Sequence, residues 1–370
     1  MGAGPVGASL AHAVHGLDVA LVGSSQEPSS AGTFDPRVYA LSPGNVDFLR
    51  RLKIWDALPA ERIAPVHAMR IHGDDGRAIL QFEAYEAGVP ELAWIVEDST
   101  LNRALRAGIP ARAQRCQHLA VSEDKAVLTF DDGTTISARL VVGADGAQSF
   151  VRRVVGIDAS ERDYGQTALV ANFACRTPHG NVAYQWFQGG PVLALLPLPG
   201  EQVSMVWSLP TSDAERISAL APAALADELM RASSGVVGAL ELASPVRAFP
   251  LRRLSARRLV APRVALVGDA GHVIHPLAGQ GLNLGLQDAR VLAETLNDRE
   301  PQRDAGDYRL LRRYERRRAE PILAMDSVVS GLFALYGARS GTVSRLRNAG
   351  LNLADRLPVL KNILMRQAMS

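Results

Sequence analysis

The stretch from Val264 to Asp288, VALVGDAGHVIHPLAGQGLNLGLQD, decides the fold. It begins with a short apolar run that ends at Gly268, which is typical of a buried strand reaching the carboxyl edge of a sheet. Asp269 follows at once, and the glycine-rich run 279–281 opens a helical pattern of leucines. Ligands of open α/β sheets bind at this edge, and the first turn of a helix favours anions. The stretch therefore predicts a carboxylate and an anion-binding helix start at one strand end.

A second glycine-rich segment opens the chain. Gly2, Gly4 and Gly7 fit the pattern GxGxxG, in which the glycines permit a tight turn, close approach of a pyrophosphate and close packing of a helix. The strand that normally precedes the first glycine is missing from the sequence. Gly23 stands at the end of the next strand, where an acidic residue would hold ribose hydroxyls. We expect a nucleotide-binding turn without its first strand and with one weakened cofactor contact.

A third strand end lies between these two segments in the sequence. The apolar run 140–143 leads into Asp145 and Gly146, followed by a helix start, about 120 residues before Asp269. Two strand ends that each present an aspartate and a glycine indicate one ligand held from several strand ends. The intervening segments 167–175, 182–187, 192–196 and 203–209 are rich in β-forming residues. They predict an antiparallel sheet laid over the nucleotide-binding part.

Length and composition set the limits of these predictions. The 370 residues, 47% of them hydrophobic, are enough for two domains, and a net charge of +2 does not suggest a nucleic-acid partner. Cys116 and Cys175 are too few for a disulfide framework, which favours a reducing, cytoplasmic setting. The sequence has no run of eighteen apolar residues and no signal-peptide pattern at its start. We therefore expect a cytoplasmic protein.

Positive charge is concentrated toward the end of the chain. Residues 308–318 carry six arginines and one glutamate, and residues 338–370 carry six basic residues and one aspartate, with leucines between them. A basic amphipathic tail of this kind can lie on an anionic membrane surface or on a partner protein. The simpler interpretation is a pair of helices packed on its own domain with a solvated basic face.

Two histidines in the opening stretch raise the question of a metal site. His272 and His275 are three residues apart, which places them on one side of a helical turn. No neighbouring carboxylate or cysteine completes a ligand set, so we expect no metal. His275 directly precedes Pro276, and a structural or ligand-lining role is expected for it, with proton transfer as the alternative.

These motifs, taken in order, resemble the single-component FAD-dependent aromatic hydroxylases. The resemblance covers almost the whole chain and is closest to the ubiquinone-biosynthesis hydroxylases. The general motif residues are Gly2, Gly4, Gly7, Gly143, Asp145, Gly146, Ser149, Arg152, Gly268, Asp269, Gly271, His272, Pro276, Gly279, Gln280, Gly281, Asn283 and Asp288. The segments that narrow the resemblance are Asp35–Ser42, His275–Gly285, Tyr314–Arg318 and Leu346–Leu353.

The resemblance implies an α/β fold like that of para-hydroxybenzoate hydroxylase. It combines a glutathione-reductase-like FAD-binding domain, an antiparallel-sheet substrate domain and a C-terminal helical segment. The FAD-binding domain is expected at residues 1–67, 97–160 and 251–300. The substrate domain is expected at 68–96 and 161–250, and the helical region at 301–370.

The resemblance also implies an activity. NAD(P)H would reduce FAD, oxygen would add to form a flavin C4a-hydroperoxide, and the ring of a polyprenylated phenol would attack it in ubiquinone biosynthesis. The enzyme would work at the inner face of a membrane, with a biosynthetic complex or a second copy of the chain as further expected partners. Two alternatives stay open: a hydroxylase of the same fold acting on a soluble aromatic compound, and a flavin-poor scaffold subunit.

Specific residue roles follow from the same resemblance. Asp269 would bind the ribityl chain near the pyrophosphate, Arg37 would contact the cofactor, and Pro276 would line the side that reacts with oxygen. Asp145 and Gly146 would support the pyrophosphate and the approach of the reductant. The residues expected to face the flavin pyrimidine edge are Gly279, Gln280, Gly281, Leu282 and Asn283. An apolar tunnel for a prenyl chain is expected among Phe173, Trp186, Phe187, Leu193, Leu195 and Trp207, although half of an alternating strand set must face a core instead.

Overall fold

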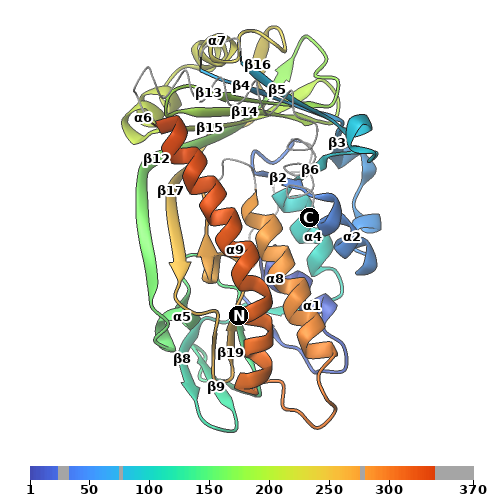
Figure 1. Ribbon diagram of the computed structural model, residues 1–370, viewed down its shortest axis with the longest axis vertical. Helices are drawn as coiled ribbons and strands as arrows, with labels where there is room; N and C mark the ends of the chain where they lie inside the picture. The colour runs from blue at the N-terminus through green and yellow to red at the C-terminus, as the bar shows by residue number, and fades with distance from the viewer. Residues whose placement is uncertain (24–32, 75–77, 276–279, 338–370) are drawn as a thin grey trace.

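The computed structural model describes residues 1–23, 33–74, 78–275 and 280–337. Figure 1 shows a large sheet across one end of the molecule and a body of shorter strands and helices beneath it. Two long strands descend from the sheet along one side of this body, and two long helices run beside each other through the molecule. Pro276, Gly279 and the basic segment 338–370 lie outside the described residues.

The body contains the strand ends that the sequence singles out. β11 (Val141–Gly143) pairs in parallel with β19 (Val264–Leu266), so that Gly143 lies opposite Leu266. The loops that carry Asp145 and Asp269 therefore leave the same edge of the sheet, which confirms that these two strand ends meet. β18 (Val260–Ala261) pairs with β19 on its other side. β1 (Leu21–Val22) pairs in parallel with β7 (Ala111–Arg112).

Helices and small sheets surround these strands. A helix–helix contact between α1 (Pro5–Ala13) and α8 (Gln280–Asn297) is close because Gly285 faces Val6: a Cβ at Gly285 would lie 2.6 Å from a Val6 methyl. The other α-helices of the body are α2 (Pro43–Arg51), α4 (Asp98–Arg106), α5 (Phe150–Val154) and α9 (Tyr308–Gly337). Its small sheets contain β2 (Val38–Leu41), β3 (Ile63–Val66), β6 (Ala93–Glu97), β8 (Cys116–Val121), β9 (Ala126–Phe130) and β10 (Thr135–Ala138). Short 3₁₀ turns are η1 (Trp55–Ala57), η2 (Ala60–Arg62) and η3 (Gly268–Ala270).

The large sheet has nine strands in the order β20-β17-β12-β15-β14-β13-β4-β5, with β16 paired to β12. Its strands are β4 (Ala68–His72), β5 (Ile79–Glu83), β12 (Ala159–Cys175), β13 (Val182–Phe187), β14 (Val192–Leu198), β15 (Gln202–Pro210), β16 (Leu240–Leu242), β17 (Arg247–Ala256) and β20 (His272–Val273). β12 begins eight residues before the predicted segment 167–175, and the lower parts of β12 and β17 are the two descending strands in Figure 1. The helices attached to the sheet are α3 (Ala84–Ala87), α6 (Thr211–Ser218) and α7 (Pro222–Ala232).

Met1 and Gly2 lie between β1 and β11 and bond to both. The amino group of Met1 donates to the Val142 carbonyl at 2.9 Å, and the Ala144 amide donates to the Met1 carbonyl at 2.7 Å. On the other side the Gly2 amide donates to the Val22 carbonyl at 2.7 Å. These bonds are those of a residue at the end of a strand that runs parallel to its neighbours. Burial lowers the pKa of the Met1 amino group, because its charged form is desolvated.

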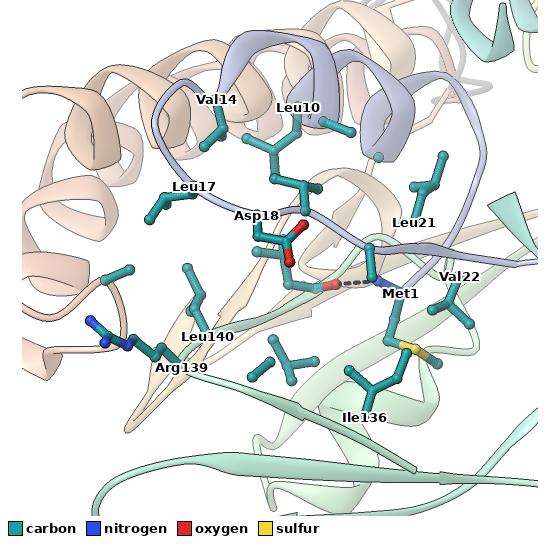
Figure 2. A pocket seen from close by; sticks show the side chains of 18 of the residues that line it. Met1, Leu10, Val14, Leu17, Asp18, Leu21, Val22, Ile136, Arg139 and Leu140 are labelled. Carbon is teal, nitrogen blue, oxygen red and sulfur yellow. Dashed lines mark hydrogen bonds between the residues drawn. The ribbon is translucent and has the colours of Figure 1, made fainter. Parts of the chain in front are cut away.

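A cavity of about 480 Å³ continues from Met1 between the same two segments. Figure 2 shows Leu10, Val14 and Leu17 on one side of it, and Ile136 and Leu140 on the other. Residues of β1 and β11 line this cavity, and most of its other walls are apolar, as in the interior of a layered α/β sheet.

We predict that a five-residue extension ahead of Met1, with β-branched residues at alternate positions, raises the free energy of unfolding by about 2 kcal/mol. The extension would form hydrogen bonds with the edges of β1 and β11 and bury its apolar side chains in the cavity. Urea unfolding measures the change. A Gly-Ser extension of equal length is the control, since it also moves the charged amino group out of the cavity. Equal unfolding midpoints for the two extensions would contradict the prediction.

Candidate functional site

The three glycines of the N-terminal turn have three different surroundings. A Cβ at Gly2 would lie 2.0 Å from the Ala144 carbonyl oxygen, and a Cβ at Gly7 would lie 2.1 Å from the Gly2 carbonyl oxygen. Gly2 also has a φ of +101°. At Gly4, by contrast, no atom lies within 4 Å of the Cβ position. Gly2 and Gly7 thus permit the turn and its close packing, while Gly4 leaves one side of the turn open to a ligand.

The open side of this turn faces the start of a helix. Gly4 is the N-cap residue of α1, and the first helical hydrogen bond runs from the Ala8 amide to the Gly4 carbonyl. The amides of Val6 and Gly7 precede this bond, so the helix start can donate to an anion such as a pyrophosphate. Arg106 of α4 holds the turn in place, because its Nε and Nη2 donate hydrogen bonds to the Ala3 carbonyl at 3.1 and 2.9 Å. No local pattern in the sequence predicts this contact.

The carboxylate of Asp145 caps a helix. Its Oδ2 accepts hydrogen bonds from the amides of Phe150 and Val151 at 2.7 and 3.1 Å, at the start of α5. Its Oδ1 is buried and has no hydrogen-bond partner among the described residues. Gly146 follows with a φ of +78°, which favours glycine. Asp145 therefore shapes the loop that leaves β11, and one of its oxygens is available to a further donor.

Asp269 lies in the loop that leaves β19. Gly268 has a φ of +59°, and the side chain of Asp269 is exposed. Desolvation by the surrounding groups raises the pKa of Asp269, while His272 and Arg37 favour its charged form. The result is an accessible carboxylate in a partly desolvated setting near Arg37, His272 and Asp288, which suits an acceptor for ligand hydroxyl groups.

Arg152 joins the Asp145 loop to the Asp269 loop. Its guanidinium donates to the Ala147 carbonyl and to the Ala270 carbonyl, both at 2.8 Å. Its side chain is buried, and Glu161 lies 3.7 Å away as a counter-charge. The two strand-end loops are therefore fixed relative to each other by one buried cation.

Arg37 extends toward the same region from β2. Its guanidinium lies 5.5 Å from the ring centre of Tyr39 and 5.8 Å from that of Phe249. The pKa of Arg37 is raised, first by Tyr39 and then by Asp98, Asp269 and Asp35, against the effect of burial. The electrostatic interaction between Arg37 and Asp269 shows that the structure brings these two predicted residues together.

The start of α8 is fixed by Asn283. Its Oδ1 accepts from the Ser42 amide and from the Asn45 side chain, both at 3.0 Å, and its Nδ2 donates to the Ala40 carbonyl at 2.8 Å. The Asn283 side chain is thus occupied with holding α8 against β2 and α2. Gln280 and Leu282 are partly exposed, and no atom lies within 4 Å of a Cβ at Gly281, so the open side of this helix start is at Gly281. The structure does not describe Pro276 and Gly279.

The predicted placement of the two histidines on one helical turn is wrong. His272 begins the short strand β20, and its Nε2 lies 2.6 Å from Oδ2 of Asp288. The His275 side chain has different neighbours: its Nε2 lies 3.1 Å from Oε1 of Gln166, and its ring makes a T-shaped contact with the ring of Tyr164. The prediction failed because Asp288, sixteen residues further along the chain, provides a stronger partner for His272 than a helical turn would.

The predicted substrate tunnel is also largely wrong. Five of its six residues pack in one buried cluster with α6 and α7, on the face of the sheet away from the body: Phe173, Trp186, Leu193, Leu195 and Trp207. Phe187 alone belongs to the opposite face, where it packs with Val192, Ile274, Leu284 and Val329. Alternation along a strand defines two faces but does not say which one a helix covers.

Gly23 packs directly against the N-terminal turn. A Cβ at this position would lie 2.7 Å from the backbone nitrogen of Ala3, and the Gly23 amide donates to the Arg112 carbonyl at 2.9 Å. In this arrangement there is no room for a side chain at position 23, so the absence of an acidic residue has a steric basis.

Known proteins match this chain over most of its length. The FAD binding domain family matches residues 1–325. The 3-demethoxyubiquinol 3-hydroxylase of Escherichia coli is 31% identical over 383 residues, covering 100% of this chain and 97% of that protein. The ubiquinone hydroxylase UbiL of Rhodospirillum rubrum is 34% identical over 382 residues, covering 100% and 88%.

Solved structures show the same fold. The p-nitrophenol 4-monooxygenase PnpA of Pseudomonas putida has a TM-score of 0.80 at 16% identity, covering 100% of this chain and 97% of that one. HpxO of Klebsiella pneumoniae, solved with FAD and uric acid, has a TM-score of 0.76 at 20% identity, covering 98% and 95%.

The fold and the site thus define an FAD-dependent monooxygenase of the FAD binding domain family. Within this family the chain belongs to the ubiquinone-biosynthesis hydroxylases. The residues present fit the cofactor, because the space beside Gly4 at the start of α1 is open and a buried oxygen of Asp145 has no partner among the described residues.

His275 gives a prediction about pH. Burial lowers its pKa to about 4, from 6.5. Between pH 4 and pH 6.5, His275 binds a proton in the unfolded chain but not in the folded chain. The contribution of His275 to the free energy of unfolding is therefore fully present above pH 6.5 and is lost as the pH falls toward 4. We expect the loss to reach about 3 kcal/mol. Urea unfolding at pH 7, 5.5 and 4.5 measures it.

The His275→Asn variant should lose most of this pH dependence. His15→Asn, at an exposed histidine, is the matched control and should keep the wild-type slope. An unchanged slope in His275→Asn would show that another group is responsible.

Proposed function

We propose that this monooxygenase hydroxylates the aromatic ring of a polyprenylated phenol, with FAD, molecular oxygen and NAD(P)H as its cofactors and co-substrates. The two relatives from Escherichia coli and Rhodospirillum rubrum support this substrate class, because they are named a 3-demethoxyubiquinol 3-hydroxylase and a ubiquinone hydroxylase. The observation that carries the proposal is the meeting of the Asp145 loop, the Asp269 loop and the N-terminal turn at one edge of the body.

Each of these three segments has a distinct task in holding the cofactor. The open side of Gly4 and the first amides of α1 receive the pyrophosphate. Asp269 accepts hydrogen bonds from the ribityl hydroxyls, and Arg37 balances the negative charge beside it. Asp145 and Gly146 support the pyrophosphate by shaping the neighbouring loop. Bound FAD supplies the redox chemistry that activates oxygen.

The start of α8 acts on the flavin ring. Its first amides, at Gln280, Gly281 and Leu282, and the positive end of its dipole stabilise negative charge on the pyrimidine edge. Asn283 keeps this helix start in place through its bonds to Ser42 and Ala40. By resemblance, Gly279 would share this contact with the pyrimidine edge and Pro276 would line the side that reacts with oxygen; both residues lie outside the part of the chain that the structure describes.

The inner face of the large sheet supplies the apolar setting for the substrate. Phe187 and Val192 from the sheet pack with Ile274, Leu284 and Val329 from the body, so apolar side chains from both parts meet. This cluster excludes water from the reacting atoms and contacts a prenyl chain without specific polar groups. His275 lies fully buried and neutral beside Gln166, which supports a structural role for it at the edge of the site.

Product analysis tests the proposed reaction. Purified, FAD-loaded protein is incubated with oxygen, NADH or NADPH, and either a prenylated phenol or the same phenol without its prenyl chain. We expect a product with one added oxygen from the prenylated compound only, and the two reductants show the nicotinamide preference. Hydroxylation of the short phenol alone would indicate a soluble aromatic substrate. A colourless protein without flavin bands, or oxygen use without hydroxylation, would contradict the proposal.

We also propose that the enzyme is cytoplasmic and attaches to the inner face of a membrane through residues 338–370. No helix in the described part of the chain is long and apolar enough to cross a bilayer. The arginines of α9 are mostly paired, Arg313 with Glu300 and Arg317 with Glu294, for example. The six basic residues of the segment 338–370 are therefore the stronger candidates for contacting anionic lipid.

Flotation with liposomes tests the attachment. We expect the full chain to float with vesicles that contain anionic lipid and not with neutral vesicles. A chain that ends at residue 337 should float with neither kind of vesicle. Equal flotation of the two chains would refute a role for this segment. The visible absorbance of the truncated chain shows whether it still holds FAD.

A further inference from the structure

A buried carboxylate lies directly behind the Asp269 loop. Asp288 of α8 is 0% exposed, and its Oδ2 accepts a hydrogen bond from the Gly268 amide at 2.8 Å. The same oxygen lies 2.6 Å from Nε2 of His272. Because a carboxylate oxygen can only accept, this histidine nitrogen carries the proton. Asp288 thus holds the loop at both of its ends, one residue before Asp269 and three residues after it.

The charge of Asp288 is balanced by an arginine from another helix. Nε of Arg318, in α9, donates to Oδ1 of Asp288 at 2.6 Å, and Arg318 is itself only 2% exposed. Burial acts to raise the pKa of Asp288, but His272, Arg318 and the Gly268 amide outweigh it and lower the pKa. Asp288 is therefore ionised, and the loss of one partner would leave a buried charge without compensation.

The contacts of Arg318 also fix α9 against α8. Its guanidinium donates to Oε1 of Gln287 at 3.2 Å and to the Leu284 carbonyl at 3.3 Å. One turn earlier in α9, the Tyr314 hydroxyl donates to the Leu266 carbonyl at 2.8 Å, at the end of β19. The position of α9 is thus set by the strand and the loop that present Asp269.

The other half of α9 reaches the large sheet. Asp326 receives two hydrogen bonds from Arg253 of β17, at 2.8 and 2.6 Å, and Val329 packs in the apolar cluster with Phe187 and Val192. Figure 1 shows α9 running from the level of β19 to the large sheet. The helix therefore connects the loop of Asp269 with the apolar side chains expected at the substrate.

We propose that Arg318 and Asp288 are positioning residues for the flavin: through Gly268 and His272 they hold the Asp269 carboxylate in its cofactor-binding orientation. The inference rests on the proposed function in one respect, namely that Asp269 faces the ribityl chain. A structural role alone would require only that the two buried charges pair. The bonds to Gly268 and His272, on either side of Asp269, connect the pair to the cofactor.

The test compares Arg318→Met with Arg317→Met, an adjacent exposed arginine of α9 that pairs with Glu294 at the surface. The dissociation constant of FAD is measured by flavin fluorescence, and the reduction potential and visible spectrum are measured at saturating FAD. We expect Arg318→Met to weaken FAD binding at least tenfold and to shift both the potential and the spectrum. Arg317→Met should match the wild type. Arg318→Lys, which keeps the charge, should recover part of the affinity.

A double variant guards against misfolding of Arg318→Met. The double variant Asp288→Leu, Arg318→Met removes both buried charges, so no unpaired charge remains in the core. It also removes the hydrogen bonds that Asp288 makes with Gly268 and His272. We expect this protein to fold, as seen by circular dichroism, and still to bind FAD at least tenfold more weakly. A folded double variant with wild-type affinity, potential and spectrum would overturn the inference.

Asp269→Asn separates this inference from the proposed function. Wild-type FAD binding in Asp269→Asn would mean that Asp269 does not face the cofactor, so the proposed site itself would be wrong. Weakened binding in Asp269→Asn together with wild-type behaviour of the Arg318 variants would leave the site standing and refute the positioning role.

Discussion

The loop between Gly268 and His272 keeps its shape because buried guanidinium groups act on it from two sides. Arg152 binds the Ala270 carbonyl directly, and Arg318 acts through the carboxylate of Asp288. In a buried setting these hydrogen bonds are costly to leave unmade, so the loop has few alternative conformations. Its one accessible acidic side chain, Asp269, is therefore presented on a rigid support.

The rest of the architecture follows from where that loop must lie. The parallel pairing of β11 with β19 puts the Asp145 loop beside it, and the contact between Val6 and Gly285 lets α1 and α8 approach closely enough for their N-terminal ends to flank the same region. α9 then spans from this body to the large sheet, with Tyr314 at one end and Asp326 toward the other. The proposed cofactor site and the proposed substrate site are thus joined by one continuous set of contacts.

Local patterns in the sequence were enough to predict the strand ends and helix starts. An apolar run that ends in Gly-Asp or Gly-Ala-Asp fixes both the strand and its carboxylate, and Pro5 and Pro43 mark the first residues of α1 and α2. Contacts between distant segments could not be predicted in this way. Arg106 reaches Ala3 across 103 residues, and Asp288 draws His272 out of the expected helical turn. The tunnel prediction failed for a related reason, since α6 and α7 cover the face of the sheet on which five of its six residues lie.

A crystal structure of the FAD-loaded protein is the most direct test of the central claim that three loops at one edge form the cofactor site. The account predicts the pyrophosphate over Gly4 at the start of α1, and a ribityl hydroxyl within hydrogen-bond distance of the Asp269 carboxylate. A cofactor that contacts neither Gly4 nor Asp269 would contradict it.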